Sequence, residues 1–279
     1  MTMTDTRSRA GSTGRAMLNK VPEVTAWFWI IKVLSTTVGE TFADYLNVTL
    51  GFGLTNTTWV MTGVFLLALA VQFALRRYAA PAYWLTVVLI SVVGTLITDN
   101  LTDGLGVPLL LTTPVFAVAL AACFWLWHRS EGTLSIHTIF TPRREAWYWL
   151  AILFTFALGT AAGDLIAEQF SLGYGVSLAL FVAAIALVAV AYFRFHINAV
   201  LGFWMAYVLT RPLGASIGDL MSSPRQAGGL GVGTTTTSYL FLGTILVIVV
   251  YLTVTRADVQ EGRDEALEPD LEVEPGPLP

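Results

Sequence analysis

The stretch that decides the fold runs from Trp29 to Asp44 and has the sequence WIIKVLSTTVGETFAD. In it a Trp is followed ten residues later by a Gly, and that Gly is followed five residues later by an Asp. The same three residues recur at the same spacing at Trp84, Gly94 and Asp99; at Trp149, Gly159 and Asp164; and at Trp204, Gly214 and Asp219. The intervals between successive Gly residues are 55, 65 and 55, so the first half of the chain maps onto the second at an offset of 120. A fixed period of this kind indicates a duplicated architecture.

The composition indicates an integral membrane protein, because 55% of the 279 residues are apolar and only 12% are charged. Each Trp-to-Asp stretch lies in an apolar segment of about twenty residues, which is long enough to cross a bilayer as a helix. A Gly-rich turn and a second apolar segment follow each one. The pattern therefore predicts an all-α integral membrane fold with eight transmembrane helices, arranged as four helical hairpins near residues 26–47, 57–76, 82–103, 107–127, 146–168, 176–195, 198–221 and 236–255.

The four hairpins divide the chain into two fused four-helix halves. We predict five segments: a disordered basic N-terminus at 1–25, a first half at 26–127, a cytoplasmic connector at 128–145, a second half at 146–255, and a disordered acidic tail at 256–279. Each hairpin contains an even number of spans, so all four have one orientation. The halves should then be parallel, with a pseudo-symmetry axis along the membrane normal.

Positive charge in the short connections predicts the orientation, because Lys and Arg stay on the cytoplasmic side. The links after the second, fourth and sixth spans hold Arg76, Arg77, Arg129, Arg143, Arg144 and Arg194. The turns at the opposite end contain only Arg225. Both termini are therefore predicted to be cytoplasmic, and the four repeated Asp residues should lie toward the outer face.

Polar residues recur along one face of the predicted first helix of each repeat. Residues four apart share a helix face, so Lys32, Thr36, Glu40 and Asp44 form a polar stripe that should point away from lipid. The Gly of each motif lies beside this stripe, where the absence of a side chain allows close helix packing. Including the equivalent positions of the other repeats, the predicted ion-binding or substrate-binding residues are Glu40, Asp44, Asp99, Asp164, Asp219, Thr95 and Thr160.

The predicted intramembrane charges are unbalanced. Five carboxylates face two cations, Lys32 and Arg211, which are expected to pair with some of them. Ionisable groups at this depth are costly and point to function. We therefore predict transport of a small cation, with protons as the candidate exchanged ion. The alternative is a non-transporting membrane scaffold or sensor whose buried charge network is structural.

The type of ion follows from the available ligands. Every candidate at membrane depth is an oxygen donor, and such donors suit hard divalent metal ions better than Zn²⁺ or Cu⁺. The predicted metal ligands are Asp44, Asp99, Asp164 and Asp219. The bilayer and a small cation or proton are the predicted partners, with no nucleic acid. No cofactor or protein partner is identified.

An enzymatic role is not predicted. Gly163-Asp164 and Gly218-Asp219 partly match intramembrane aspartyl proteases, which pair two Asp residues across helices. However, the chain lacks both the Gly-x-Gly-Asp and the Pro-Ala-Leu motifs of those proteases. Four equivalent Asp residues also differ from a catalytic pair.

Several motifs together resemble one family. They are Gly39-Glu40-Thr41 through Asp44-Tyr45, Asp99-Asn100, Gly163-Asp164 and Thr210-Arg211-Pro212-Leu213-Gly214. The stretch from Lys20 to Arg256 resembles a bacterial family of uncharacterised multi-pass membrane-anchored proteins. The resemblance implies a bacterial inner-membrane location and no activity. The chain does not carry the Glu-x-Gly-Asp-Lys/Arg pattern of one group of manganese and calcium transporters.

Overall fold

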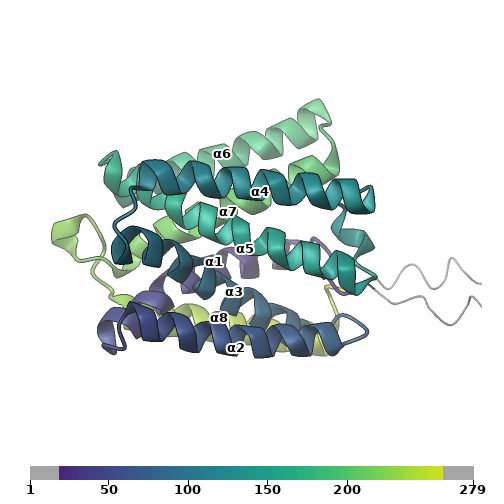
Figure 1. Ribbon diagram of the computed structural model, residues 1–279, viewed down its shortest axis with the longest axis horizontal. Coiled ribbons are helices and arrows are strands. Elements are labelled where there is room, and N and C mark those ends of the chain that lie inside the picture. The colour runs from purple at the N-terminus through teal and green to yellow at the C-terminus, as the bar shows by residue number, and fades with distance from the viewer. Residues whose placement is uncertain (1–18, 260–279) are drawn as a thin grey trace, which may run out of the picture.

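The computed structural model describes residues 19–259, apart from the side chain at position 168, and these residues are folded into eight long α-helices (Figure 1). The helices are α1 (Ala26–Asp44), α2 (Leu54–Ala74), α3 (Ala80–Asp99), α4 (Leu109–Glu131), α5 (Pro142–Asp164), α6 (Gly173–Phe195), α7 (Ala199–Ser222) and α8 (Thr234–Thr255). The predicted helices are therefore confirmed to within a few residues at each end. The predicted terminal segments 1–18 and 260–279 lie outside the described residues.

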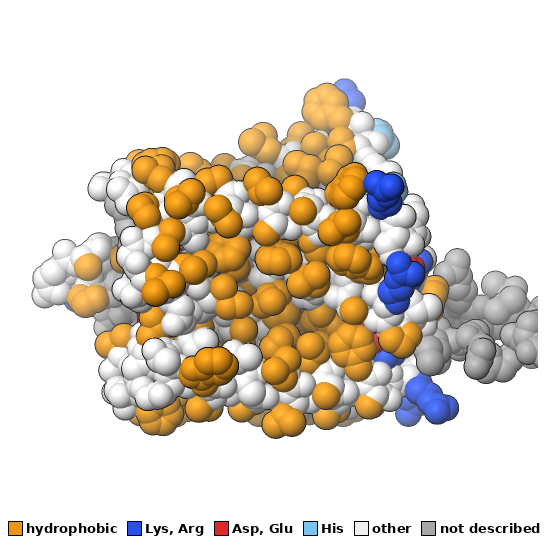
Figure 2. Space-filling view, in the orientation of Figure 1, with side chains coloured by type: hydrophobic (Ala, Val, Ile, Leu, Met, Phe, Trp, Pro, Cys, Tyr) orange, Lys and Arg blue, Asp and Glu red, His pale blue; other side chains and the backbone are white. Residues whose placement is uncertain are grey.

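The surface of the helical bundle is that of a multi-pass membrane protein. Seven helices, α2 to α8, are long and apolar enough to cross a membrane. The remaining helix, α1, carries Lys32, Glu40 and Asp44 within its nineteen residues. Hydrophobic side chains cover the long side of the molecule in Figure 2, and Lys and Arg gather at one end. That end is the one where the described chain begins and finishes in Figure 1.

The first helices of the four repeats pack against one another in a closed ring. The helix α1 packs on α3 and α7, and α5 also packs on α3 and α7. Each second helix packs mainly on the first helix of the following repeat: α2 on α3, α4 on α5, α6 on α7 and α8 on α1. The two helices of one repeat are therefore not each other's main packing partner. We call α1, α3, α5 and α7 the inner helices and the others the outer helices.

Sequence determines which helices lie inside. The outer helices are apolar around their whole circumference, and only 17–28% of their span residues are buried. The inner helices α3, α5 and α7 have 50–78% of their span residues buried. Their polar stripes, like that of α1, are removed from the apolar surface by packing against other inner helices. This arrangement explains why α1, which carries Lys32 and Glu40 within its span, can lie inside the bundle.

The repeated Gly residues are the points of closest approach between inner helices. A Cβ atom placed on any of them would overlap a side chain of the next inner helix: Gly39 would meet Ser91, Gly94 would meet Phe156, Gly159 would meet Arg211 and Gly214 would meet Thr36. Each contacted residue lies seven positions after the Trp of its own repeat. The prediction that the motif Gly allows close helix packing is confirmed.

The described ends of the chain meet at the end of the bundle that is rich in Lys and Arg. Lys20 is 3% exposed, and its Nζ lies 2.6 Å from Glu145 Oε2. The backbone N–H of Glu23 donates to the carbonyl oxygen of Asp258 at 3.0 Å, and the Tyr78 hydroxyl donates to the Asp258 carboxylate. Burial raises the pKa of the Asp258 carboxyl above its ordinary value, although the hydrogen bond from Tyr78 opposes this.

These contacts involve the described ends of the two predicted terminal segments. Residues 19–25 and 256–259 were assigned by sequence to disordered segments, but they include buried polar groups that are paired with the helical bundle. The sequence analysis missed them because neither stretch has apolar periodicity, and one ion pair and a few hydrogen bonds hold them in place.

Candidate functional site

Side chains at every fourth position of the inner helices form successive layers along the ring. From the Lys-rich and Arg-rich end outward these are the aromatic layer (Phe28, Tyr83, Tyr148, Phe203), the lysine layer (Lys32, Val87, Ile152, Tyr207), the arginine layer (Thr36, Ser91, Phe156, Arg211), the threonine layer (Glu40, Thr95, Thr160, Ala215) and the aspartate layer (Asp44, Asp99, Asp164, Asp219). Every residue of the lysine, arginine and threonine layers is buried. The four aspartates are partly exposed. The ring is therefore packed shut along most of its length and reaches solvent at the aspartate layer.

Arg211 links all four inner helices. Its side chain is fully buried, and Nη2 lies 2.9 Å from Glu40 Oε2 in α1 and 2.6 Å from Thr160 Oγ1 in α5. The same nitrogen donates to Thr95 Oγ1 in α3, and Nη1 donates to the carbonyl oxygen of Thr36 at 2.9 Å. A planar guanidinium with five N–H groups suits several acceptors at once. The structure thus places Glu40, Thr95 and Thr160, which the sequence predicted as ion ligands, around an internal cation.

The surroundings of Lys32 differ from those of Arg211. Its side chain is fully buried, and Nζ has no hydrogen-bond partner among the described residues. The nitrogen lies over two aromatic rings, 4.0 Å from the centre of Phe156 and 4.2 Å from the centre of Tyr207. The predicted pairing with a carboxylate is therefore found for Arg211 and not for Lys32. The sequence shows that Lys32 shares a helix face with Glu40, but Arg211 takes the Glu40 carboxylate.

The aspartate layer lies where the inner helices end or change geometry. Asp44, Asp99 and Asp164 are the last residues of α1, α3 and α5, and each is followed by a π-helical turn of five residues. Asp219 precedes the end of α7 by three residues. A carboxylate near a helix C-terminus is disfavoured by the helix dipole, so these residues are not helix caps. Wider π turns in α-helices frequently occur at functional sites.

The carboxylates influence one another. Asp99 interacts electrostatically with Glu40, Asp44 and Asp164, which belong to two other inner helices. Within residues 19–259, however, no group of three or more His, Cys, Asp or Glu side chains has an arrangement that could hold a metal ion. The metal-binding role of the four Asp residues stays a prediction. In this structure they form an acidic surface at the end of the ring and not a compact metal cage.

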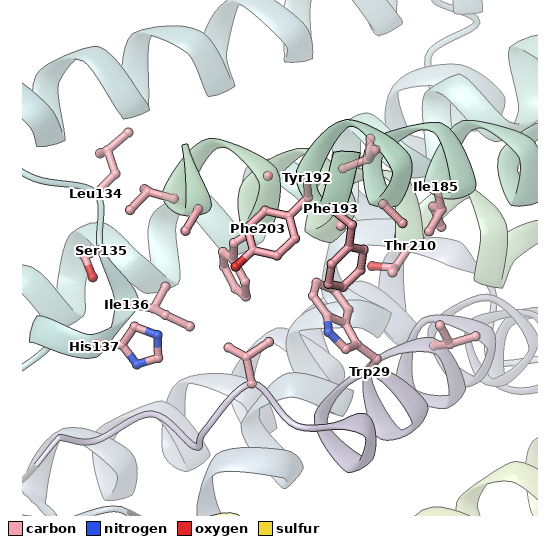
Figure 3. A pocket seen from close by; sticks show the side chains of 18 of the residues that line it. Trp29, Leu134, Ser135, Ile136, His137, Ile185, Tyr192, Phe193, Phe203 and Thr210 are labelled. Carbon is pink, nitrogen blue, oxygen red and sulfur yellow. The ribbon is translucent and has the colours of Figure 1, made fainter. Parts of the chain in front are cut away.

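An apolar cavity lies outside the ring, near the aromatic layer. It has a volume of about 550 Å³ and is bounded by Trp29 of α1, Phe193 of α6, Phe203 of α7 and the connector around His137 (Figure 3). Its walls are mostly hydrophobic, and none of the four motif Asp residues lines it. The ionisable groups of interest therefore lie along the ring and not in this cavity.

The sequence analysis missed the tyrosines of the ring. Tyr83 and Tyr148 are both fully buried, and their hydroxyl groups are hydrogen-bonded to each other. They occupy the same position in two repeats, immediately before the motif Trp. Tyr207 is the counterpart of Lys32 in the fourth repeat, and its buried hydroxyl has no hydrogen-bond partner among the described residues. Extending the repeat register beyond the three motif residues would have identified all of them.

Comparison with known proteins identifies the repeat but no activity. The family described as Repeat of Unknown Function (DUF347) matches the chain four times, over residues 27–78, 82–133, 147–198 and 202–258. Each match spans one inner helix and the outer helix that follows it. No curated protein and no solved structure matches the chain.

Proposed function

Since the chain belongs to the family of this Repeat of Unknown Function, whose description carries no activity, we propose from its own residues that it transports a small cation across a membrane. The proposed substrate is a hard divalent ion, and protons are the exchanged ion. The proposed site is the aspartate layer. The residues of the ring support transport and not catalysis, because four carboxylates at equivalent positions do not form an acid–base pair.

One observation carries the proposal: partly exposed carboxylates from all four inner helices lie at the end of a ring that is otherwise packed shut. Arg211 is ion-paired with Glu40, and the four Asp residues lie one layer further along the ring. Their mutual repulsion is relieved when a cation or protons bind. A transporter that works by alternating access exposes its binding site to one side of the membrane at a time. Buried lysine, arginine and threonine layers next to a partly exposed aspartate layer are the arrangement expected when the site is open to one side only.

The absence of a compact carboxylate cage is compatible with a hydrated ion. Magnesium keeps several water molecules and is commonly held by only one or two protein carboxylates. An acidic surface that offers such a pair could therefore receive a partly hydrated ion. Tighter coordination would require the inner helices to move closer together, which is a change that transport itself involves.

We further propose a symmetry and an orientation. The Gly contacts follow one pattern from each inner helix to the next, which supports four parallel repeats around an axis along the membrane normal. In this arrangement all eight helices, including α1, span the inner membrane of a bacterium. The positively charged connections and both termini face the cytoplasm, so the aspartate layer faces outward.

The proposed orientation predicts which loops are labelled from outside. On a Cys123→Ala background, Gln226→Cys in the turn before α8 should react with an impermeant maleimide in intact spheroplasts. His137→Cys in the central connector should react only after lysis. Both positions are exposed in the structure, so accessibility to the reagent is set by the membrane. Labelling of His137→Cys from outside would contradict the orientation.

The transport proposal predicts that removing charge from the aspartate layer stops ion movement while preserving the fold. Asp99→Asn and Asp219→Asn should each reduce the initial rate of Mn²⁺ flux into proteoliposomes by at least about tenfold, since one lost charged contact is worth about 1.5–3 kcal/mol. Asn keeps the size and hydrogen-bonding capacity of Asp. The melting temperature in detergent should therefore change little.

Asp103→Asn provides the matched control, because Asp103 is an exposed carboxylate only four residues beyond Asp99. Its flux should resemble that of the unsubstituted protein. If the aspartate-layer variants lose stability and their flux per folded molecule is unchanged, the charges are structural. That result favours a scaffold or sensor over a transporter.

A further inference from the structure

Lys32 is a buried cation of the ring whose nitrogen contacts aromatic rings but has no hydrogen-bond acceptor among the described residues. Its side chain is fully buried. An ammonium group in such surroundings costs several kcal/mol unless water or another ligand reaches it. Arg211, in contrast, has four hydrogen-bond acceptors that include a carboxylate. The two buried cations are therefore built for different roles.

We propose that Lys32 is the proton-binding site of the exchanger, and that the hydroxyl groups of Tyr207, Tyr148 and Tyr83 connect it to the cytoplasmic end. The inference rests on the proposed function, because it names the group that carries the exchanged proton. Arg211 remains a fixed positive charge. Lys32 alternates between the ammonium and the neutral amine.

The tyrosines form a buried polar path that begins beside Lys32. Lys32 Nζ lies over the ring of Tyr207, and the Tyr207 hydroxyl is buried without a partner. The rings of Tyr148 and Tyr207 both lie against the ring of Trp204, with centroids 6.3 Å and 5.5 Å away, and the Tyr148 hydroxyl is hydrogen-bonded to that of Tyr83. Unpartnered buried polar atoms that are close together are the usual sites of internal water. Water between Lys32, Tyr207 and the tyrosine pair would complete the path.

The path reaches the cytoplasmic end through Tyr78. The rings of Tyr78 and Tyr83 are 5.7 Å apart, and the Tyr78 hydroxyl donates to the carboxylate of Asp258. In the proton-release step, the Lys32 ammonium gives one proton to the water and hydroxyl chain and becomes a neutral amine. Each hydroxyl accepts one proton and passes one on, so no tyrosine changes its net charge. One proton leaves at the cytoplasmic end as the ion loads from that side. After the ion leaves outward from the aspartate layer, Lys32 takes up one proton from the outer side, so ion and proton cross the membrane in opposite directions.

The charges around Lys32 couple this proton to the transported cation. Arg211 of α7 acts on Lys32 as a like charge. Cation binding at the aspartate layer adds further positive charge to the same ring and favours release of the Lys32 proton. The titratable and charged groups on the elements packed around Lys32 are Glu40 and Asp44 on α1, Tyr207, Arg211 and Asp219 on α7, Tyr83 and Asp99 on α3, Arg143, Arg144, Glu145, Tyr148 and Asp164 on α5, and Tyr239 and Tyr251 on α8.

Proton counting tests the proposal directly. Calorimetric titration with Mn²⁺ in buffers of different ionisation enthalpy measures the protons released for each ion bound. Lys32→Met should release about one proton fewer per ion than the unsubstituted protein, since it removes one titrating group. An unchanged proton count would assign the released protons to the carboxylates and overturn the proposal. Lys32→Gln serves as the second variant if Lys32→Met does not fold.

The tyrosine path has a separate signature. Tyr207→Phe leaves the proton count unchanged but slows Mn²⁺-driven pH change in dye-loaded liposomes by about tenfold or more, because it removes a positioned proton carrier. Tyr251→Phe is the matched control, since that residue is exposed on α8 and is expected to have no effect. Equal rates for Tyr207→Phe and the control would exclude the tyrosine path.

A third measurement separates this inference from the proposed function. The difference in melting temperature between the unsubstituted protein and Lys32→Met should vary with pH between about 6 and 10 if Lys32 changes protonation state. This holds even if Mn²⁺ does not bind, in which case the transport proposal alone fails. If this difference in melting temperature is constant with pH, Lys32 keeps one protonation state. A difference that follows chloride concentration at fixed pH identifies a bound anion, and either result overturns the proposal.

Discussion

Replacing Arg211 with Met is expected to reduce the free energy of unfolding by about 3–5 kcal/mol, because the substitution leaves a buried carboxylate without its cation. Glu40 is 8% exposed and has no other ion pair among the described residues. The hydroxyl oxygens of Thr95 and Thr160 also lose a donor. Thermal and denaturant unfolding of the purified protein in detergent would measure the loss.

Two variants make this result specific. The double variant Glu40→Gln with Arg211→Met removes both charges and should recover at least half of the lost stability, since neutral replacements of a buried ion pair are tolerated. Arg225→Met removes an exposed Arg and should change stability by less than about 0.5 kcal/mol. If Arg211→Met were as mild as Arg225→Met, the guanidinium would not hold the inner helices together.

Gly214→Ala is expected to separate α1 from α7. The new Cβ atom would lie 1.8 Å from Thr36 Oγ1, 2.5 Å from Thr36 Cβ and 3.0 Å from the backbone nitrogen of Thr37. A rotamer change of Thr36 cannot relieve the last two contacts, so the backbones must move apart. Overpacking of this kind costs about 1–3 kcal/mol, and more when backbone is displaced. Unfolding in detergent, together with the fraction of monodisperse protein, would report it.

Gly63→Ala and Gly243→Ala are the matched controls. Both Gly residues lie within outer helices, and a Cβ atom there would meet nothing within 4 Å. Ala is the better helix former, so each control should gain about 0.5–1 kcal/mol. Destabilisation by the controls to the same extent as by Gly214→Ala would mean that helical Gly residues matter in this fold for a reason other than packing.

The sequence predicts the helices and their contact points better than it predicts their neighbours. The spacing of Gly39 and Gly214 placed small residues beside the polar face, and the structure uses both for close packing. The packing of α2 on α3 was not predictable in the same way. An outer helix that is apolar all round has no face that identifies its partner.

The candidate site was predicted in part for a similar reason. Helical spacing brought Glu40 and Lys32 onto one face of α1, and both Lys32 and Arg211 were predicted to pair with carboxylates that the spacing could not specify. The actual partner of Glu40 is Arg211, which lies 171 positions away in the chain. Spacing within one helix gives the depth of a side chain. It does not show which residue of another repeat meets it at that depth.

The placement of each outer helix on the following repeat has a consequence for how such a chain arises. In a single hairpin, no outer helix would pack on the inner helix, and the outer helix would have no inner helix to pack against. Both helices would find their packing partners only in a closed assembly of four copies, in which the second helix of each copy packs on the first helix of the next. Joining the copies in tandem preserves every contact, provided that the last helix returns to the first, as α8 does to α1. Fusion also frees the four copies to differ in sequence, which is how one ring can hold a single Lys32 and a single Arg211 at positions that the other repeats fill with Val, Ile, Tyr, Thr, Ser and Phe.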